Sequence, residues 1–202
     1  MSHASTRFQN PLIALDIGNV SMKLSFDEMY GYLGVDPKDL AGAVSRLWEH
    51  GSALETGRCT VPEFLDRLDE FTGHKHTHRE LLDFWRSGVR QTMPGMAKAV
   101  QKLASRGIRF SFFSDISPIH LEQVFKYCEF RHLITGGVYS FEVGALKMDD
   151  CVMLDAFEAR YGRPAVFFDD REQIIQRATS YGWKAIQFTS ADQFLCEVSV
   201  MF

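Results

Sequence analysis

Five side chains that can do chemistry stand at or near the ends of short apolar segments, and a sixth, Lys147, lies in the loop "FEVGALKMDD" just before a predicted helix. The six are Asp16, Ser114, Asp115, Lys147, Asp169 and Asp170. The apolar segments have the composition of buried parallel strands. Open α/β sheets bind ligands outside the carboxyl ends of their strands. We therefore expect these six side chains to converge on one small volume.

The types of these side chains indicate phosphoryl transfer. Two or three carboxylates at close range repel each other unless a cation neutralises them, and oxygen-only ligands suit a hard ion such as Mg²⁺. A lysine and a serine hydroxyl suit a dianionic phosphoryl group, and a carboxylate can act as a nucleophile. Each residue alone could be a helix cap or a turn residue. The ordered set predicts a site for Mg²⁺ and a small phosphorylated molecule.

The second half of the chain alternates predicted helices with predicted strands, which indicates a parallel sheet covered on both faces. Predicted strands span 11–17, 108–114, 132–137, 165–170 and 184–188. Predicted helices span 95–107, 117–128, 149–162, 171–182 and 190–198. The sequence therefore predicts the α/β class, with a Rossmann-like parallel sheet as its core.

A helical segment interrupts this alternation directly after the first strand. Apolar residues recur at helical spacing from 27 to about 90, as in "LAGAVSRLWEH", "VPEFLDRLDEF" and "LLDFWRSGV". We expect four or so short helices there and no strand. The predicted organisation is a core domain of residues 1–20 and 93–202 with an inserted helical cap of residues 21–92.

Composition excludes several classes of protein. The chain has 202 residues, 46% of them hydrophobic, and a net charge of −4 with acids and bases dispersed. This predicts no nucleic-acid partner and no membrane partner. The first ten residues lack the apolar core of a signal peptide and read as a frayed tail. The four cysteines, Cys59, Cys128, Cys151 and Cys196, are scattered, which favours reduced, buried thiols in a cytoplasmic protein. Monomer and homodimer both stay open.

The motifs, in this order, resemble those of the haloacid dehalogenase (HAD) superfamily. The first motif of that family is a strand ending in a nucleophilic Asp, here "ALDIGNV", and the second is a strand ending in Ser or Thr, here "FSFFSD". The third is a Lys ahead of a helix, here "GALKMDD", and the fourth is an acidic pair after a strand, here "VFFDD". The resemblance covers nearly the whole chain, including the helical cap, and points to small phosphatases whose first motif reads D-x-G-N-V.

The resemblance implies a role for each motif residue. Asp16 would be the nucleophile, and Ser114, Asp115 and Lys147 would bind the phosphoryl group, with Lys147 also neutralising Asp16. The metal ligands would be the carboxylates of Asp16, Asp169 and Asp170 and the backbone carbonyl of Gly18. The cap would cover the site and select the substrate.

The sequence departs from the family pattern at several places. Gly18 stands where most of these phosphatases carry a second Asp that protonates the leaving oxygen, so we expect an acidic leaving group or a proton donor from elsewhere. Ile174 stands where an Asn or Asp usually supports the metal. Arg171 follows the acidic pair and would either pair with Asp170 and compete with the cation or point to solvent. Met148 stands where Pro is common.

Other candidates carry alternative interpretations. His74, His76 and His78 alternate in "HKHTH" and could hold a metal, but a solvated loop is favoured. Trp85 belongs to the cap core or lines the substrate pocket. His120, close to Ser114, is a candidate substitute for the missing acid.

Three functions compete. An Mg²⁺-dependent phosphatase acting through phospho-Asp16 is ranked first, since the acidic pair and Lys147 favour it. A weakly active or inactive HAD-like binding domain is second, because of Arg171 and Ile174. A hydrolytic dehalogenase is third: a halide needs no protonation, but that class needs no metal and lacks the acidic pair.

Overall fold

A five-stranded parallel sheet forms the centre of the computed structural model, which describes residues 10–25, 29, 47, 49 and 51–202. The strand order is β5-β4-β1-β6-β7. The bounds are β1 (Leu12–Leu15), β4 (Arg109–Ser114), β5 (Ile134–Tyr139), β6 (Val166–Asp169) and β7 (Ala185–Gln187). All four pairings are parallel. The predicted α/β class with a Rossmann-like sheet is confirmed.

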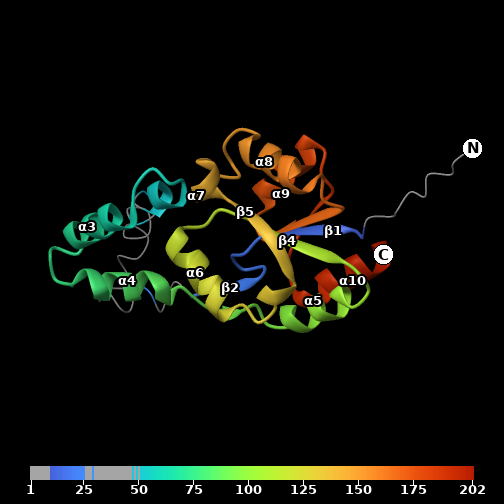
Figure 1. The fold of residues 1–202 in the computed structure, drawn as a ribbon, viewed down its shortest axis with the longest axis horizontal. Helices are drawn as coiled ribbons and strands as arrows, with labels where there is room; N and C mark the ends of the chain where they lie inside the picture. The colour runs from blue at the N-terminus through green and yellow to red at the C-terminus, as the bar shows by residue number, and fades with distance from the viewer. Residues whose placement is uncertain (1–9, 26–28, 30–46, 48, 50) are drawn as a thin grey trace, which may run out of the picture.

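Helices cover both faces of this sheet (Figure 1). One face packs against α5 (Met96–Ala104), α6 (Pro118–Tyr127) and α10 (Ala191–Met201). The other packs against α7 (Ser140–Val143), α8 (Val152–Tyr161) and α9 (Glu172–Tyr181). Successive side chains of a strand point to opposite faces, so Ile13 and Leu15 enter the first apolar cluster while Leu12 and Ala14 enter the second. The central strand β1 is therefore buried on both sides.

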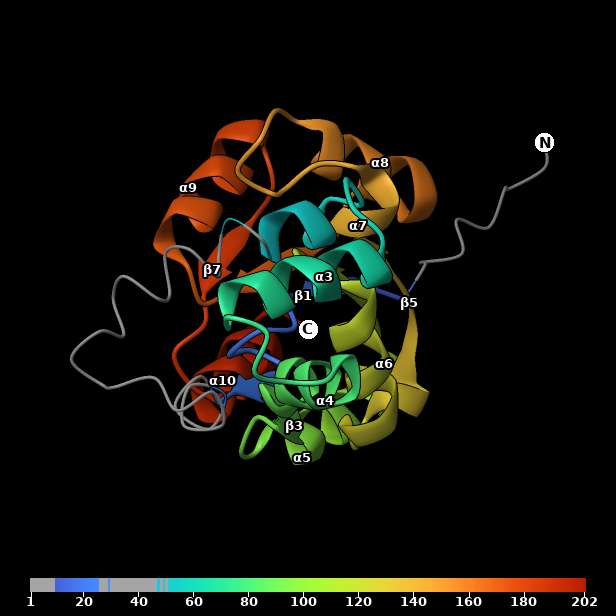
Figure 2. The same ribbon diagram turned by 90° about the vertical axis from the view of Figure 1, so that its left-hand side faces the viewer.

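A helical unit, here residues 51–88, projects beyond one end of the sheet (Figure 1, left). It contains a helical segment at 51–55, α3 (Val61–Phe71) and α4 (His78–Ser87). Thr60 and Thr77 begin the two longer helices with capping boxes, which satisfy backbone N–H groups that would otherwise lack partners. A third apolar cluster, including Phe64, Phe84 and Trp85, holds the unit together. Seen from that end, α3 and α4 lie in front of the core (Figure 2).

Two short antiparallel strands join the helical unit to the core. In β2 (Met22–Leu24) and β3 (Val89–Thr92), Met22 pairs with Thr92 and Lys23 with Gln91. The prediction that the inserted segment needs no strand is wrong, because the chain leaves and re-enters the core at one place and the two passages can share hydrogen bonds. Strand β3 also takes residues that the sequence assigned to the end of a helix.

The structure corrects smaller predictions as well. Strand β5 extends to Tyr139 and is followed by α7, which the sequence analysis missed, and η2 (Arg131–Leu133) precedes it. The predicted tail at 1–10 and the predicted helix at 40–50 lie almost wholly outside the described residues. All four cysteines are free, but Cys151 and Cys196 are exposed, so the expectation of burial is wrong for them. No helix within the described ranges is long and apolar enough to span a membrane.

A substitution at Phe113 tests the packing of the second apolar cluster. Its ring lies 5.2 Å from that of Phe167, 5.3 Å from that of Trp183 and 5.5 Å from that of Phe157. We expect Phe113→Ala to lower the free energy of unfolding by about 3–5 kcal/mol, because it leaves a cavity in a close-packed cluster. Urea unfolding followed by circular dichroism measures this. Phe202→Ala, at a half-exposed ring, should cost less than about 1 kcal/mol; equal losses in both variants would contradict this account.

Candidate active site

Three neighbouring strands deliver the predicted site residues to one edge of the sheet. Asp16 follows β1, Ser114 ends β4 and Asp169 ends β6. Strand β1 pairs with both of the others, and the backbone N–H of Asp16 donates to the carbonyl of Phe168 over 2.9 Å. The order of strands, which the sequence does not state, thus places Asp16 between the second and fourth motifs.

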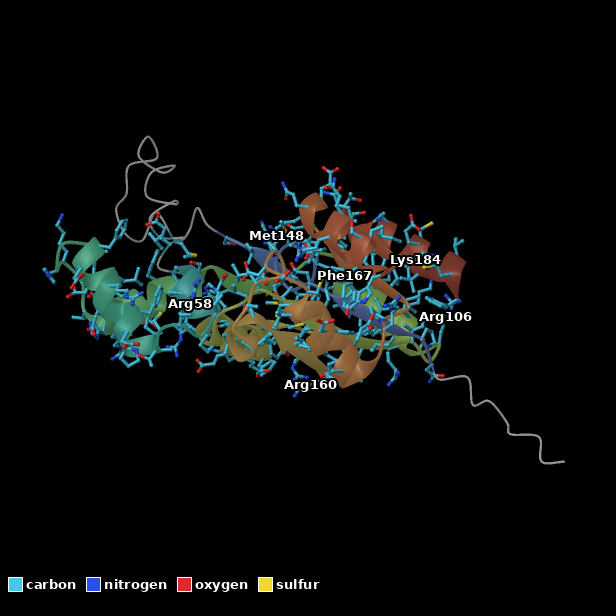
Figure 3. The ribbon with its side chains drawn as sticks, turned by 90° about the horizontal axis from the view of Figure 1, so that it is seen from above. Arg58, Arg106, Met148, Arg160, Phe167 and Lys184 are labelled. Carbon is cyan, nitrogen blue, oxygen red and sulfur yellow. The ribbon has the colours of Figure 1, made fainter. Side chains whose placement is uncertain are left out.

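Lys147 lies at the centre of the site. Its Nζ donates to Asp16 Oδ1 over 2.8 Å and to Asp169 Oδ2 over 2.5 Å. The side chain is buried, and the backbone N–H of the same residue donates to Asp115 Oδ1 over 2.8 Å. One lysine therefore connects three of the predicted carboxylates. Met148, the residue after Lys147, lies between Arg58 of the helical unit and Phe167 of β6 along the long axis of the molecule (Figure 3).

Burial and neighbouring charges set the ionisation of these groups. Burial raises the pKa of Asp16 to about 6, and Asp169 raises it too, against the lowering effect of Lys147. Burial would also raise the pKa of Asp169, but Lys147 and Arg171 outweigh it and the pKa is lowered. Burial would lower the pKa of Lys147, yet the facing carboxylates raise it. Lys147 therefore stays positively charged. Asp16 is ionised at neutral pH, although its raised pKa shows that its negative charge is only partly compensated.

Arg171 occupies neither of its predicted positions. Its Nη2 donates to Asp115 Oδ2 over 3.0 Å, and its Nε lies 3.5 Å from Asp169 Oδ1. Its backbone N–H donates to the same Asp169 oxygen over 2.9 Å. Both expectations for this residue, competition for Asp170 and a side chain in solvent, are wrong, because two other carboxylates lie within its reach. Arg171 thus lies at the edge of the site and interacts with the carboxylates of Asp115 and Asp169.

Asn19 supports Asp170, a contact that the sequence analysis missed. Its Nδ2 donates to Asp170 Oδ2 over 3.2 Å, and its Oδ1 accepts from the Leu24 backbone N–H over 3.3 Å. Its φ of 50° lies in the left-handed region, which Asn tolerates better than most residues. Ile174 is buried in the second apolar cluster instead. Asn19, in the loop that follows β1, thus gives Asp170 the support that Ile174 cannot give.

The donor set fits a hard divalent cation. One oxygen each from Asp16, Asp169 and Asp170 can be chosen so that all lie within 4.8 Å of one another. Both oxygens of Asp169 already accept hydrogen bonds, as do Asp16 Oδ1 and Asp170 Oδ2. Within the described part of the chain, Asp16 Oδ2 and Asp170 Oδ1 accept none. Carboxylate oxygens are the ligands that Mg²⁺ prefers, so these two are the best-placed candidates.

Ser114 and Gly18 stand beside this network. Ser114 is buried, and its hydroxyl donates to the carbonyl of Asp115 over 3.2 Å; among the described residues it makes no hydrogen bond to Asp16 or Lys147. A Cβ at Gly18 would lie 3.9 Å from Asp16 Oδ2 but 3.1 Å from Leu24 Cδ1. Leucine thus crowds the place where an acidic side chain at this position would begin.

The histidines take structural positions. The ring of His120 stacks on Trp85 at 5.0 Å, and its Nε2 donates to the Trp85 carbonyl over 2.8 Å. Burial lowers the pKa of His120 to about 4, so the ring is neutral near pH 7 and does not suit the acid role considered for it. His74 contacts Asp69 and His78 contacts Asp66 at the exposed surface, and the only candidate metal cluster among the described residues is the aspartate group.

Solved structures with a similar fold include HAD proteins. A HAD family enzyme from Bacteroides thetaiotaomicron superposes with a TM-score of 0.75 at 16% identity, over 90% of this chain and 94% of that one. A predicted HAD-like family hydrolase from Porphyromonas gingivalis gives 0.75 at 16% identity, over 96% and 98%. The Bacteroides enzyme in complex with magnesium and inorganic phosphate gives 0.72 at 18%, over 90% and 95%. The chain therefore has the fold of the HAD-like hydrolases.

The likeness is one of three-dimensional structure. No protein-family model matches the sequence, and no curated protein sequence matches it. The overall fold is therefore shared where few residues are identical.

Binding of Mg²⁺ tests the roles of Asp170 and Asn19. We expect isothermal titration calorimetry to detect Mg²⁺ binding to the wild type. Asp170→Asn should abolish the signal because it removes a ligand. Asn19→Gly should raise the Kd about 10–100-fold, because the amide that orients Asp170 is lost, while Gly accepts the left-handed backbone. Asp150→Asn, at an exposed acid outside the site, is the matched control; unchanged affinity in Asn19→Gly would contradict the supporting role.

Proposed function

We propose that the protein is an Mg²⁺-dependent phosphatase of a small phosphorylated metabolite, acting through a phospho-Asp16 intermediate. The observation that carries this proposal is the bridge from Lys147 to Asp16 and Asp169 beside the second acid, Asp170. A phosphoryl group needs cationic partners and a nucleophile within reach. The binding of magnesium and inorganic phosphate by an enzyme of the same fold supports this choice.

The proposed reaction has two steps. In the first, a carboxylate oxygen of Asp16 attacks phosphorus, the bond from phosphorus to the leaving oxygen breaks, and the leaving oxygen takes up a proton. In the second, water attacks the phosphorus of phospho-Asp16, the bond from Asp16 to phosphorus breaks, and inorganic phosphate leaves. Lys147 orients the Asp16 carboxylate through its hydrogen bond to Oδ1. Bound Mg²⁺ would neutralise charge on the phosphoryl oxygens.

We further propose that residues 21–92 act as a cap over the core of residues 1–20 and 93–202. Support comes from the antiparallel pair of β2 and β3, called here the β2–β3 stem. This pair brings together the two chain connections between the core and the helical unit. The Trp85 indole also donates to Ser117 Oγ over 3.3 Å, next to the His120 contact. Both contacts fix the helical unit to α6, at the edge of the sheet that carries the site. A unit held there would limit the size and shape of the substrate.

The contacts of the site weigh against the two alternatives. The binding-domain hypothesis depended on Arg171 and Ile174, but Arg171 pairs with Asp115 and Asp169, and Asn19 supplies the support for Asp170. A dehalogenase has the same fold, with a TM-score of 0.65 at 14% identity over 93% of this chain and 96% of that one. Three clustered carboxylates are better explained by a cation, which displacement of a halide does not require.

Turnover of p-nitrophenyl phosphate tests the proposed function. We expect the wild type to release p-nitrophenol with Mg²⁺ and not with a chelator. Asp16→Asn should reduce turnover below detection while circular dichroism stays unchanged, because an amide cannot form the intermediate. Asp150→Asn should retain full activity. Undiminished turnover in Asp16→Asn would refute the mechanism, and a folded wild type that hydrolyses neither this compound nor a panel of sugar phosphates would favour the binding domain.

A further inference from the structure

The leaving oxygen needs a proton that the first motif cannot supply. Gly18 has no side chain, and Leu24 of β2 lies 3.1 Å from where its Cβ would be. Lys147 is committed to two carboxylates, and Asp115 accepts from Lys147 and Arg171. A poor leaving group therefore requires an acid from outside these loops.

Glu55 is buried in the helical unit without a full set of partners. It lies at the end of the 51–55 helical segment and is 8% exposed. Its Oε2 is inaccessible to solvent and has no hydrogen-bond partner among the described residues. Buried polar atoms are nearly always paired, so an unpaired carboxyl oxygen indicates a ligand or a reaction that supplies its partner.

The charges that act most strongly on Glu55 belong to the candidate active site. They are Asp115 after β4, Arg171 at the start of α9, Asp16 after β1 and Lys147 ahead of α8. Glu55 is therefore near the charged groups of the candidate active site. Burial, first, and then Asp115 raise the pKa of Glu55 to about 8. The carboxyl group consequently carries a proton at neutral pH.

A tight turn holds Glu55 against the core. Gly57 has a φ of +65°, and a Cβ there would lie 2.6 Å from the carbonyl oxygen of Phe141 in α7. Only glycine permits both this backbone conformation and this close approach. Thr56 Oγ1 donates to the Ser52 carbonyl and accepts from Arg58 Nε, each over 2.7 Å. These contacts fix the segment that carries Glu55 beside the edge of the sheet.

We propose that Glu55 is the general acid of the phosphatase, supplied by the helical unit in place of the side chain missing at Gly18. This inference depends on the proposed function. As the bond from phosphorus to the leaving oxygen breaks, the Glu55 O–H proton passes to that oxygen, which departs as the alcohol. The Glu55 carboxylate then regains a proton from solvent, and the water that attacks phospho-Asp16 passes its protons to the inorganic phosphate and to solvent. Both steps balance, and Glu55 ends protonated.

The dependence on the leaving group tests this role. p-Nitrophenolate leaves readily without protonation, whereas phenol, with a pKa near 10 like that of the tyrosine side chain, needs an acid. We expect Glu55→Gln to lower kcat on phenyl phosphate about 10²-fold or more and on p-nitrophenyl phosphate less than about 10-fold. Glu70→Gln, at an exposed acid of the same helical unit, should match the wild type on both substrates.

The pH profile gives an independent readout. Wild-type kcat on phenyl phosphate should fall above about pH 8, as Glu55 loses its proton. Glu55→Gln should lack this decline, because its amide does not titrate. Glu55→Asp keeps an acid on a shorter side chain, and its selective loss on phenyl phosphate should be intermediate.

The outcomes separate the two proposals. If the wild type is active, Asp16→Asn is inactive and Glu55→Gln equals Glu70→Gln on phenyl phosphate, only the role of Glu55 is overturned. Equal losses on both substrates in Glu55→Gln also overturn it, since a structural role would give that result. If the wild type hydrolyses neither substrate, or Asp16→Asn retains turnover, the phosphatase mechanism fails and the role of Glu55 fails with it.

Discussion

The buried ammonium group of Lys147 is the interaction on which the site depends. Without it, Asp16 and Asp169 would place two negative charges close together in a medium of low polarity, and both could not stay ionised. The same residue binds Asp115 through its backbone, and Asp115 in turn binds Arg171. Four loops are thereby fixed at one edge of the sheet. Buried charge networks of this kind add little net stability, because desolvation is costly; here the network determines geometry.

This network divides the work among similar carboxylates. Asp169 has both oxygens engaged by Lys147 and Arg171 and acts as an anchor. Asp16 is held through one oxygen, which leaves the other toward the substrate side, and Asp170 is held through one oxygen by Asn19. Position relative to fixed cations and amides, more than residue type, therefore distinguishes the proposed nucleophile Asp16 and the proposed metal ligand Asp170 from Asp169.

In the proposed mechanism, the helical unit completes the site with a residue that is distant from most of the motif residues in sequence. Its attachment combines the β2–β3 stem, the stack of Trp85 on His120 and the turn at Gly57. Leu24 of the stem crowds the position beside Gly18, while the 51–55 segment brings Glu55 to the same charges. In the proposed mechanism, Glu55 of the helical unit thus takes the place of the side chain that Gly18 lacks.

The sequence by itself determined the α/β class and the positions of the motif residues at strand ends, because strand and helix periodicities and the chemistry of carboxylates, lysine and serine are local properties. It also placed a helical segment after the first strand. Tertiary structure alone decided which residues meet. Asn19 reaches Asp170 across 151 positions of sequence, Arg171 turns to Asp115 and not to Asp170, and Glu55 is an ordinary polar residue of a helical pattern until packing buries it. Contacts of this kind depend on strand order and on the docking of the helical unit, and neither is encoded in local spacing.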